Sequence, residues 1–148
     1  MTQTSYSLRV EGCPRPWTVQ VRRAKRSPGF EAMQSWQAAI QAAIVETFPN
    51  RQPLEGPVSL CLEFYLPLPK ACPQRHGPRT NWLVMHQPKK FDNTNLTKAC
   101  EDALARPHPV FGQMLILNDS QVVHTQAWKY WDMRPGGQGH TEITVAPA

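Results

Sequence analysis

Acidic residues, cysteine pairs and long apolar runs are all scarce in this sequence of 148 residues. The four cysteines lie far apart without a CxxC pair, which argues against a zinc module or a disulfide scaffold. No run approaches the roughly 20 apolar residues of a membrane span, and residues 1–12 lack the apolar core of a signal peptide. We therefore expect a cytoplasmic protein without membrane contact.

Length and composition indicate one folded domain. A chain of 148 residues can bury a core without disulfides or a structural metal. A hydrophobic content of 41% and the lack of a low-complexity tract argue against disorder, while 15 prolines indicate many loops. We therefore interpret residues 1–148 as a single domain.

Positive charge is unevenly distributed along the chain. Five basic residues and no acid lie between Gly12 and Phe30, and five more, again without an acid, lie between Glu63 and Asp92. Such stretches are either solvated loops or surfaces that face a polyanion, of which a nucleic-acid backbone is the commonest. Charge alone leaves both interpretations open.

Periodicity predicts an α+β fold in which two main helices pack on a small mixed sheet. Residues 67–90 contain prolines among basic residues and predict a long functional loop, with a possible short strand over 82–85. The expected strands cover residues 6–11, 58–66, 122–131 and 141–145, with a further possible strand over 17–21, and the expected helices cover 30–48 and about 92–104.

The second helix has one apolar face and one polar face. At 100° per residue, Leu96, Ala99, Cys100, Ala103 and Leu104 share the apolar face. The polar face carries Thr94, Asn95, Lys98, Glu101 and Asp102, so that Lys98 and Asp102 form an i,i+4 pair and Thr94 or Asn95 is the expected N-cap.

Four of the eleven acids lie between residues 92 and 119 and could bind a metal: Asp92, Glu101, Asp102 and Asp119. Carboxylates that hold Mg²⁺ are a common solution for phosphodiester hydrolysis. Asp102 lies roughly 10 Å along the helix from Asn95, so Asp92 and Asp102 share one ion only if the preceding chain folds back. Spacing alone also allows a structural interpretation, with Asp92 as a helix cap, Lys98 in surface pairs with Glu101 and Asp102, and Asp119 as a turn residue. We expect this turn at the end of a strand that includes residues 114–117.

Three motifs resemble the RusA-like Holliday-junction resolvases, a family of phage and prophage endonucleases. That family has an aspartate-x-aspartate-Asn-Leu-x-Lys run that opens a helix, Asp-Ala-Leu inside this helix and an Asp-Asp-x-Gln-Val turn. The corresponding segments here are DNTNLTK (92–98), DAL (102–104) and NDSQVV (118–123).

The resemblance implies a homodimeric, Mg²⁺-dependent endonuclease that binds four-way DNA junctions and nicks two strands symmetrically, with Mn²⁺ as a possible substitute metal. Asp92, Lys98 and Asp119 match the family's catalytic positions. Asp92 and Asp119 match metal-binding aspartates, and we add Asp102 as a third candidate ligand. Lys98 matches the catalytic lysine and would neutralise charge on the phosphate or on the leaving oxygen.

The chain departs from the family pattern at two carboxylates, since Thr94 and Asn118 stand where aspartates are expected. Thr94 could coordinate through its hydroxyl or a bridging water, with Asp102 or Glu101 completing the charge. Alternatively, the protein binds junctions with weakened catalysis, or the fold serves another DNA transaction.

A junction-binding dimer needs positive surface for several duplex arms, which gives the basic stretches a role. The predicted DNA contacts are Lys89, Lys90, Lys129, Arg22, Arg23 and Arg26.

Overall fold

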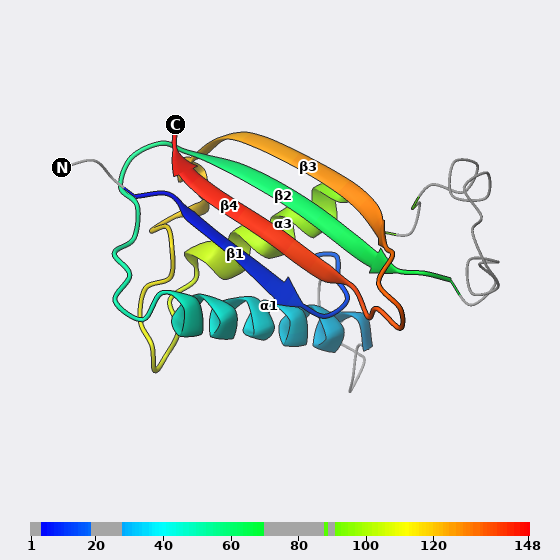
Figure 1. Cartoon of the computed structure of the whole chain (residues 1–148). Coiled ribbons are helices and arrows are strands. Elements are labelled where there is room, and N and C mark those ends of the chain that lie inside the picture. The colour runs from blue at the N-terminus through cyan, green and yellow to red at the C-terminus, as the bar shows by residue number, and fades with distance from the viewer. Residues whose placement is uncertain (1–3, 19–27, 70–87, 89–90) are drawn as a thin grey trace.

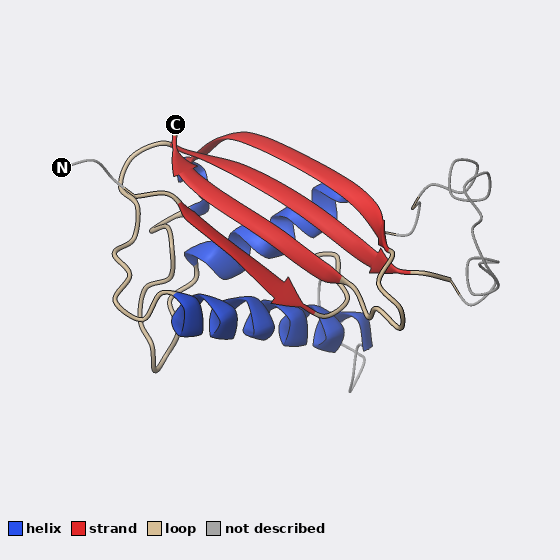
Figure 2. Cartoon of the chain, viewed as in Figure 1, coloured by secondary structure: helices blue, strands red, loops and turns tan. Residues whose placement is uncertain are grey.

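The computed structural model describes residues 4–18, 28–69, 88 and 91–148. Their elements follow the order β1 (Tyr6–Glu11), α1 (Pro28–Thr47), β2 (Val58–Pro67), α3 (Asn93–Ala105), a short 3-10 helix η2 (Asp119–Gln121), β3 (Val122–Asp132) and β4 (His140–Pro147). Figures 1 and 2 show both long helices on the same face of one four-stranded sheet. The expected α+β architecture is confirmed.

The sheet is mixed, because it contains one parallel pair of strands and two antiparallel pairs. Its strand order is β1-β4-β2-β3. Antiparallel pairs join β4 to β1 and to β2, whereas β2 and β3 are parallel and are connected through α3. This crossover sets α3 beside β3 and η2, and so brings the predicted motifs of residues 92–104 and 118–123 together.

The central strand β2 has the two-residue alternation that its sequence predicts. Val58, Leu60, Leu62, Phe64 and Leu66 are buried beneath the helices, while the residues between them are partly exposed on the other face. The first four of these side chains belong to the hydrophobic core cluster, which also contains the buried apolar residues of α1 and α3.

Buried glutamines of α1 fix the position of α3. Gln37 Nε2 donates to the carbonyl oxygen of Ala99 at 3.0 Å and to Asp102 Oδ2 at 2.9 Å. Gln41 Nε2 donates to the carbonyl oxygens of Ala103 at 3.0 Å and Arg106 at 2.8 Å. Because Gln37 and Gln41 are almost fully buried, these bonds form away from water and hold α3 in one register along α1.

Two expectations need correction. Residues 17–18 are not in a strand, and the rest of the possible strand over 17–21 lies outside the described residues, as does the possible strand over 82–85. Residues 114–116 are buried but form only an isolated bridge between Ile116 and Leu54. Asp119 therefore lies immediately before β3, not at the end of an earlier strand.

None of the helices in the described part of the chain is long and apolar enough to cross a membrane.

Replacing Gln37 by Met should lower the free energy of unfolding by about 1–3 kcal/mol, because the buried bond to Ala99 and the partly buried bonds to Asp102 and Arg106 are lost while a side chain of similar length remains. Urea unfolding followed by circular dichroism measures this change. Gln34→Met is the matched control, since Gln34 is exposed on the same helix and should change stability little. Equal losses in both variants would contradict the proposed contribution of the buried glutamine bonds.

Candidate active site between α3 and β3

Asp92 forms the N-cap of α3. Its Oδ1 accepts from the backbone N–H of Thr94 at 2.7 Å and of Asn95 at 3.3 Å, and its backbone has an extended conformation. Thr94 and Asn95 are therefore not the cap, and the prediction that one of them fills this position is wrong. The exposed Asp92 carboxylate is held by the free amides of the first turn, where the helix dipole also favours an anion.

Two contacts with β3 fix the start of α3. Lys129 extends from the helix-facing side of the strand and donates from Nζ to the carbonyl oxygen of Phe91 at 2.8 Å. Asn93 Nδ2 donates to the carbonyl oxygen of Ala127 at 3.3 Å. Phe91 has a φ of 67°, a conformation that costs free energy for a bulky residue, and the Lys129 bond helps to hold it.

A rigid turn carries Asp119. Asn118 caps η2 by accepting from the Ser120 N–H at 2.9 Å, and Gln121 Oε1 accepts in return from the Asn118 N–H at 2.9 Å. Gln121 Nε2 donates to the carbonyl oxygens of Leu54 and Gly56, both at 2.8 Å. The turn is thereby attached to the chain before β2, which fixes the backbone from which Asp119 projects.

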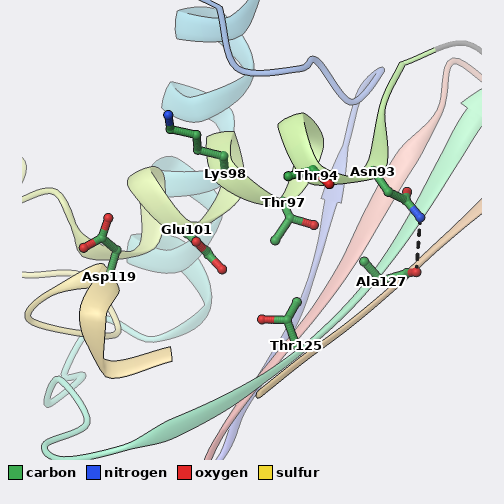
Figure 3. Close-up of a pocket in the computed structure, with 8 residues that line it drawn as sticks. All are labelled: Asn93, Thr94, Thr97, Lys98, Glu101, Asp119, Thr125 and Ala127. Atoms are coloured by element: carbon green, nitrogen blue, oxygen red, sulfur yellow. Dashed lines mark hydrogen bonds between the residues drawn. The ribbon is translucent and has the colours of Figure 1, made fainter. Parts of the chain in front are cut away.

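A pocket lies where α3 faces η2 and the first half of β3 (Figure 3). Three elements contribute side chains, and most of the polar ones come from a single face of α3, at helical steps of three and four residues. The lining residues are Asn93, Thr94, Thr97, Lys98, Glu101, Asp119, Thr125 and Ala127.

Glu101 and Asp119 bring two carboxylates to this pocket from different elements. Burial raises the pKa of Glu101, and the nearby negative charge of Asp119 raises it further. Within the described ranges neither carboxylate forms an ion pair. The pocket therefore concentrates negative charge that a bound cation would stabilise.

The family model described as Endodeoxyribonuclease RusA matches residues 14–146 of the chain. The chain belongs to the RusA endodeoxyribonuclease family. At the level of the family, this membership supports an endonuclease that acts on Holliday junctions in DNA recombination. No curated protein matches the sequence.

The RusA-family motif residues separate into two groups in space. Lys98, Asp119 and Thr94 line the pocket, and Glu101, which was predicted only in a supporting role, lines it as well. Asp92 caps the adjacent helix end and is not among the lining residues.

Asp102 lies outside the pocket and bonds to other partners. Its Oδ2 accepts from Gln37 and forms a 3.1 Å salt bridge with Arg106. The expected pair of Lys98 and Asp102 is not formed, because the ammonium of Lys98 instead lies over the ring of Trp17. Lys89, Lys90, Arg22, Arg23 and Arg26 lie outside the described residues.

The donor atoms of the pocket fit a hard divalent cation. Besides the two carboxylates they comprise threonine hydroxyls and the Asn93 side chain, whose Oδ1 is buried and has no hydrogen-bond partner among the described residues. Carboxylate, amide and hydroxyl oxygens are typical ligands of Mg²⁺, directly or through water. No cluster of three or more His, Cys, Asp or Glu occurs in the described ranges, so such a site would need these neutral donors or water.

The sequence contains a signal for most of the pocket residues on α3. Thr94, Thr97, Lys98 and Glu101 are spaced as neighbours on one helix face, and of these only Thr97 is missing from the predicted polar face. Thr125 and Asn93 had no comparable signal, because their positions depend on the packing of α3 against β3.

Replacing Glu101 by Gln should stabilise the metal-free protein at pH 7. Because its pKa is raised in the folded state, ionisation of Glu101 costs stability as the pH rises above the ordinary value of 4.5. The gain over wild type should therefore be small at pH 4 and larger at pH 7. Urea unfolding in EDTA at both pH values measures it.

Glu46→Gln on the exposed side of α1 serves as the control and should not show this pH-dependent gain. A Glu101→Gln protein that is less stable than wild type at pH 7 would contradict the cost of ionising Glu101 in the folded state.

Proposed function

We propose that the protein is a Mg²⁺-dependent endonuclease that binds four-way DNA junctions as a homodimer and resolves them by paired nicks. The observation that carries this proposal is the meeting of Glu101 and Asp119 in one pocket that Lys98 also lines, in a chain of the RusA family. Such an arrangement suits phosphodiester hydrolysis, which needs a metal held by oxygen ligands and a positive group near the phosphate.

Glu101 and Asp119 are the strongest candidates for the metal ligands. Burial and, to a smaller extent, the charge of Asp119 raise the pKa of Glu101, and a bound divalent ion would favour the ionised form of both carboxylates. Asn93, Thr94 and Thr97 add neutral oxygen atoms around the same pocket. When bound, Mg²⁺ would supply an activated water and a Lewis acid for the phosphate.

The Glu101 carboxylate can supply the pocket with the charge that Thr94 lacks. Both residues line the pocket from α3, but they lie about two turns, roughly 10 Å, apart along the helix, so Glu101 would bring its charge to the part of the pocket near Asp119. Asp102 is less suited to this role because its Oδ2 is already bonded to Gln37 and Arg106. Asp92 remains a predicted ligand, and its bonds to the first amides of α3 keep its carboxylate at the helix end.

Lys98 would act on the substrate itself. An ammonium at the edge of a metal pocket can neutralise the charge that builds on the phosphate or on the leaving oxygen. Its exposed position leaves it accessible to a DNA backbone.

A second candidate function is junction binding with weakened catalysis. The observation that favours it is Thr94, which leaves the first turn of α3 with one carboxylate fewer than the family pattern. Such a protein would bind branched DNA with a steep salt dependence and without a metal-dependent step.

The wild-type protein should cut a synthetic four-way junction in Mg²⁺ or Mn²⁺ and leave linear duplex of the same sequence largely intact. Asp119→Asn should lower cutting by about 100-fold or more, because it removes a charged metal ligand. Junction binding should stay equal or tighten, because a negative charge near DNA is removed. Denaturing gels measure cutting, and fluorescence anisotropy measures binding.

Junction binding without cutting at any pH from 6 to 9 would support the second function instead. Equal affinity for linear and branched DNA would argue against both.

Moving the carboxylate along α3 tests the assignment of Glu101. Glu101→Gln should weaken Mn²⁺ binding and lower cutting by about 10- to 100-fold, and adding Thr94→Asp to this variant should restore both in part, because the new carboxylate lines the same pocket from another turn of α3. Mn²⁺ electron paramagnetic resonance of the DNA-free protein measures the metal affinity, and the junction assay measures the rate.

Asp102→Asn is the comparison variant, because it shows whether Asp102 or its neighbour Glu101 is the metal ligand. A loss of Mn²⁺ affinity in Asp102→Asn, together with unchanged affinity in Glu101→Gln, would favour Asp102 as the ligand.

A further inference from the structure

We propose that Trp17 is a positioning residue that holds the Lys98 ammonium away from Glu101 and Asp119. The lysine then stays available for the phosphate and the carboxylates stay available for a metal. The role of Lys98 in this proposal rests on the proposed nuclease function.

The contact itself is close. Lys98 Nζ lies 3.5 Å from the centroid of the Trp17 ring, well inside the roughly 6 Å at which a cation is attracted to an aromatic face. Tryptophan gives the strongest such attraction among the aromatic residues. Because a lysine side chain has many rotamers, a partner of this kind restricts where the charge lies.

The Trp17 ring is anchored, so it can impose a position on Lys98. The Trp17 backbone N–H donates to the carbonyl oxygen of Asn95 at 2.9 Å, and the half-buried side chain packs against the core. Two residues earlier, the Arg15 guanidinium lies 5.9 Å from the ring centroid of Phe91. Residues 15–17 therefore lie along the start of α3.

The direction in which the Lys98 side chain extends indicates that the Trp17 contact keeps its ammonium from the pocket carboxylates. In Figure 3, Glu101 extends from α3 toward the sheet, whereas Lys98 extends in the opposite direction. Glu101 lies three residues after Lys98, a spacing at which opposite charges on a helix usually attract. No salt bridge joins Lys98 to Glu101 or Asp119 within the described residues, although all three line one pocket. An ammonium that turned toward these carboxylates would compete with the divalent cation for the same charge.

Trp17→Leu and Trp17→Phe form the test pair, because leucine keeps an apolar side chain without a ring and phenylalanine keeps a weaker aromatic face. Protein labelled with ¹³C at the lysine ε-carbon should show one ε-methylene signal shifted by the ring current of Trp17. Lys98→Arg identifies this signal by its loss. The shift should disappear in Trp17→Leu and stay in part in Trp17→Phe.

Kinetics then show whether the position matters for cutting. The single-turnover rate on saturating four-way junction should fall about 2- to 30-fold in Trp17→Leu and less in Trp17→Phe, with junction affinity unchanged within about twofold. Mn²⁺ binding to the DNA-free protein should weaken about twofold in Trp17→Leu as Lys98 turns toward Glu101. Trp128→Leu, on the sheet surface away from the pocket, is the matched control and should change none of these values.

The proposal is overturned if wild-type Lys98 shows no ring-current shift, or if Trp17→Leu cuts as fast as wild type or faster. It is also overturned if Trp17→Phe and Trp17→Leu lose the same activity, because this would indicate packing alone. A wild-type protein that binds junctions without cutting would refute the proposed nuclease function, and the lysine signal and Mn²⁺ affinity would still decide whether Trp17 keeps Lys98 from the carboxylates.

Discussion

The hydrogen bonds from Gln37 and Gln41 to α3 are the constraint on which the site depends. Apolar packing alone allows two helices to slide and rotate with little change in buried area, whereas a bond to a particular carbonyl oxygen fixes both register and rotation. The glutamine bonds therefore determine which face of α3 looks toward η2 and β3. Glu101 reaches the pocket, and Asp102 remains on the side of α1, because the helix is held in this rotation.

The pocket concentrates like charges, and the surrounding structure holds it together against their repulsion. The pKa of Glu101 is raised by burial and by Asp119, so the ionised pair destabilises the fold at neutral pH. Rigid supports offset this tendency, since Gln121 attaches the Asp119 turn to the chain before β2, and Lys129 fixes the start of α3. Such a local loss of stability is common where a site is preorganised for a charged ligand.

Sequence patterns predicted the helices and strands better than they predicted the contacts between them. The alternation in β2 and the apolar stripe of α3 follow from the two periodicities of strands and helices, so both were readable. The nearness of Glu101 to Asp119 arises from the crossover between β2 and β3 and has no local signal. Gln37 and Gln41 are polar residues at core positions, and the bonds that both donate to backbone carbonyl oxygens of a distant helix are shown by no side-chain pattern.

The bonds that hold α3 have a consequence for how the family can vary. Gln41 binds only carbonyl oxygens, and Gln37 binds one as well, so these bonds survive almost any exchange of side chains on the outer face of the helix. A carboxylate at another position on this outer face would therefore leave the attachment of α3 to α1 intact.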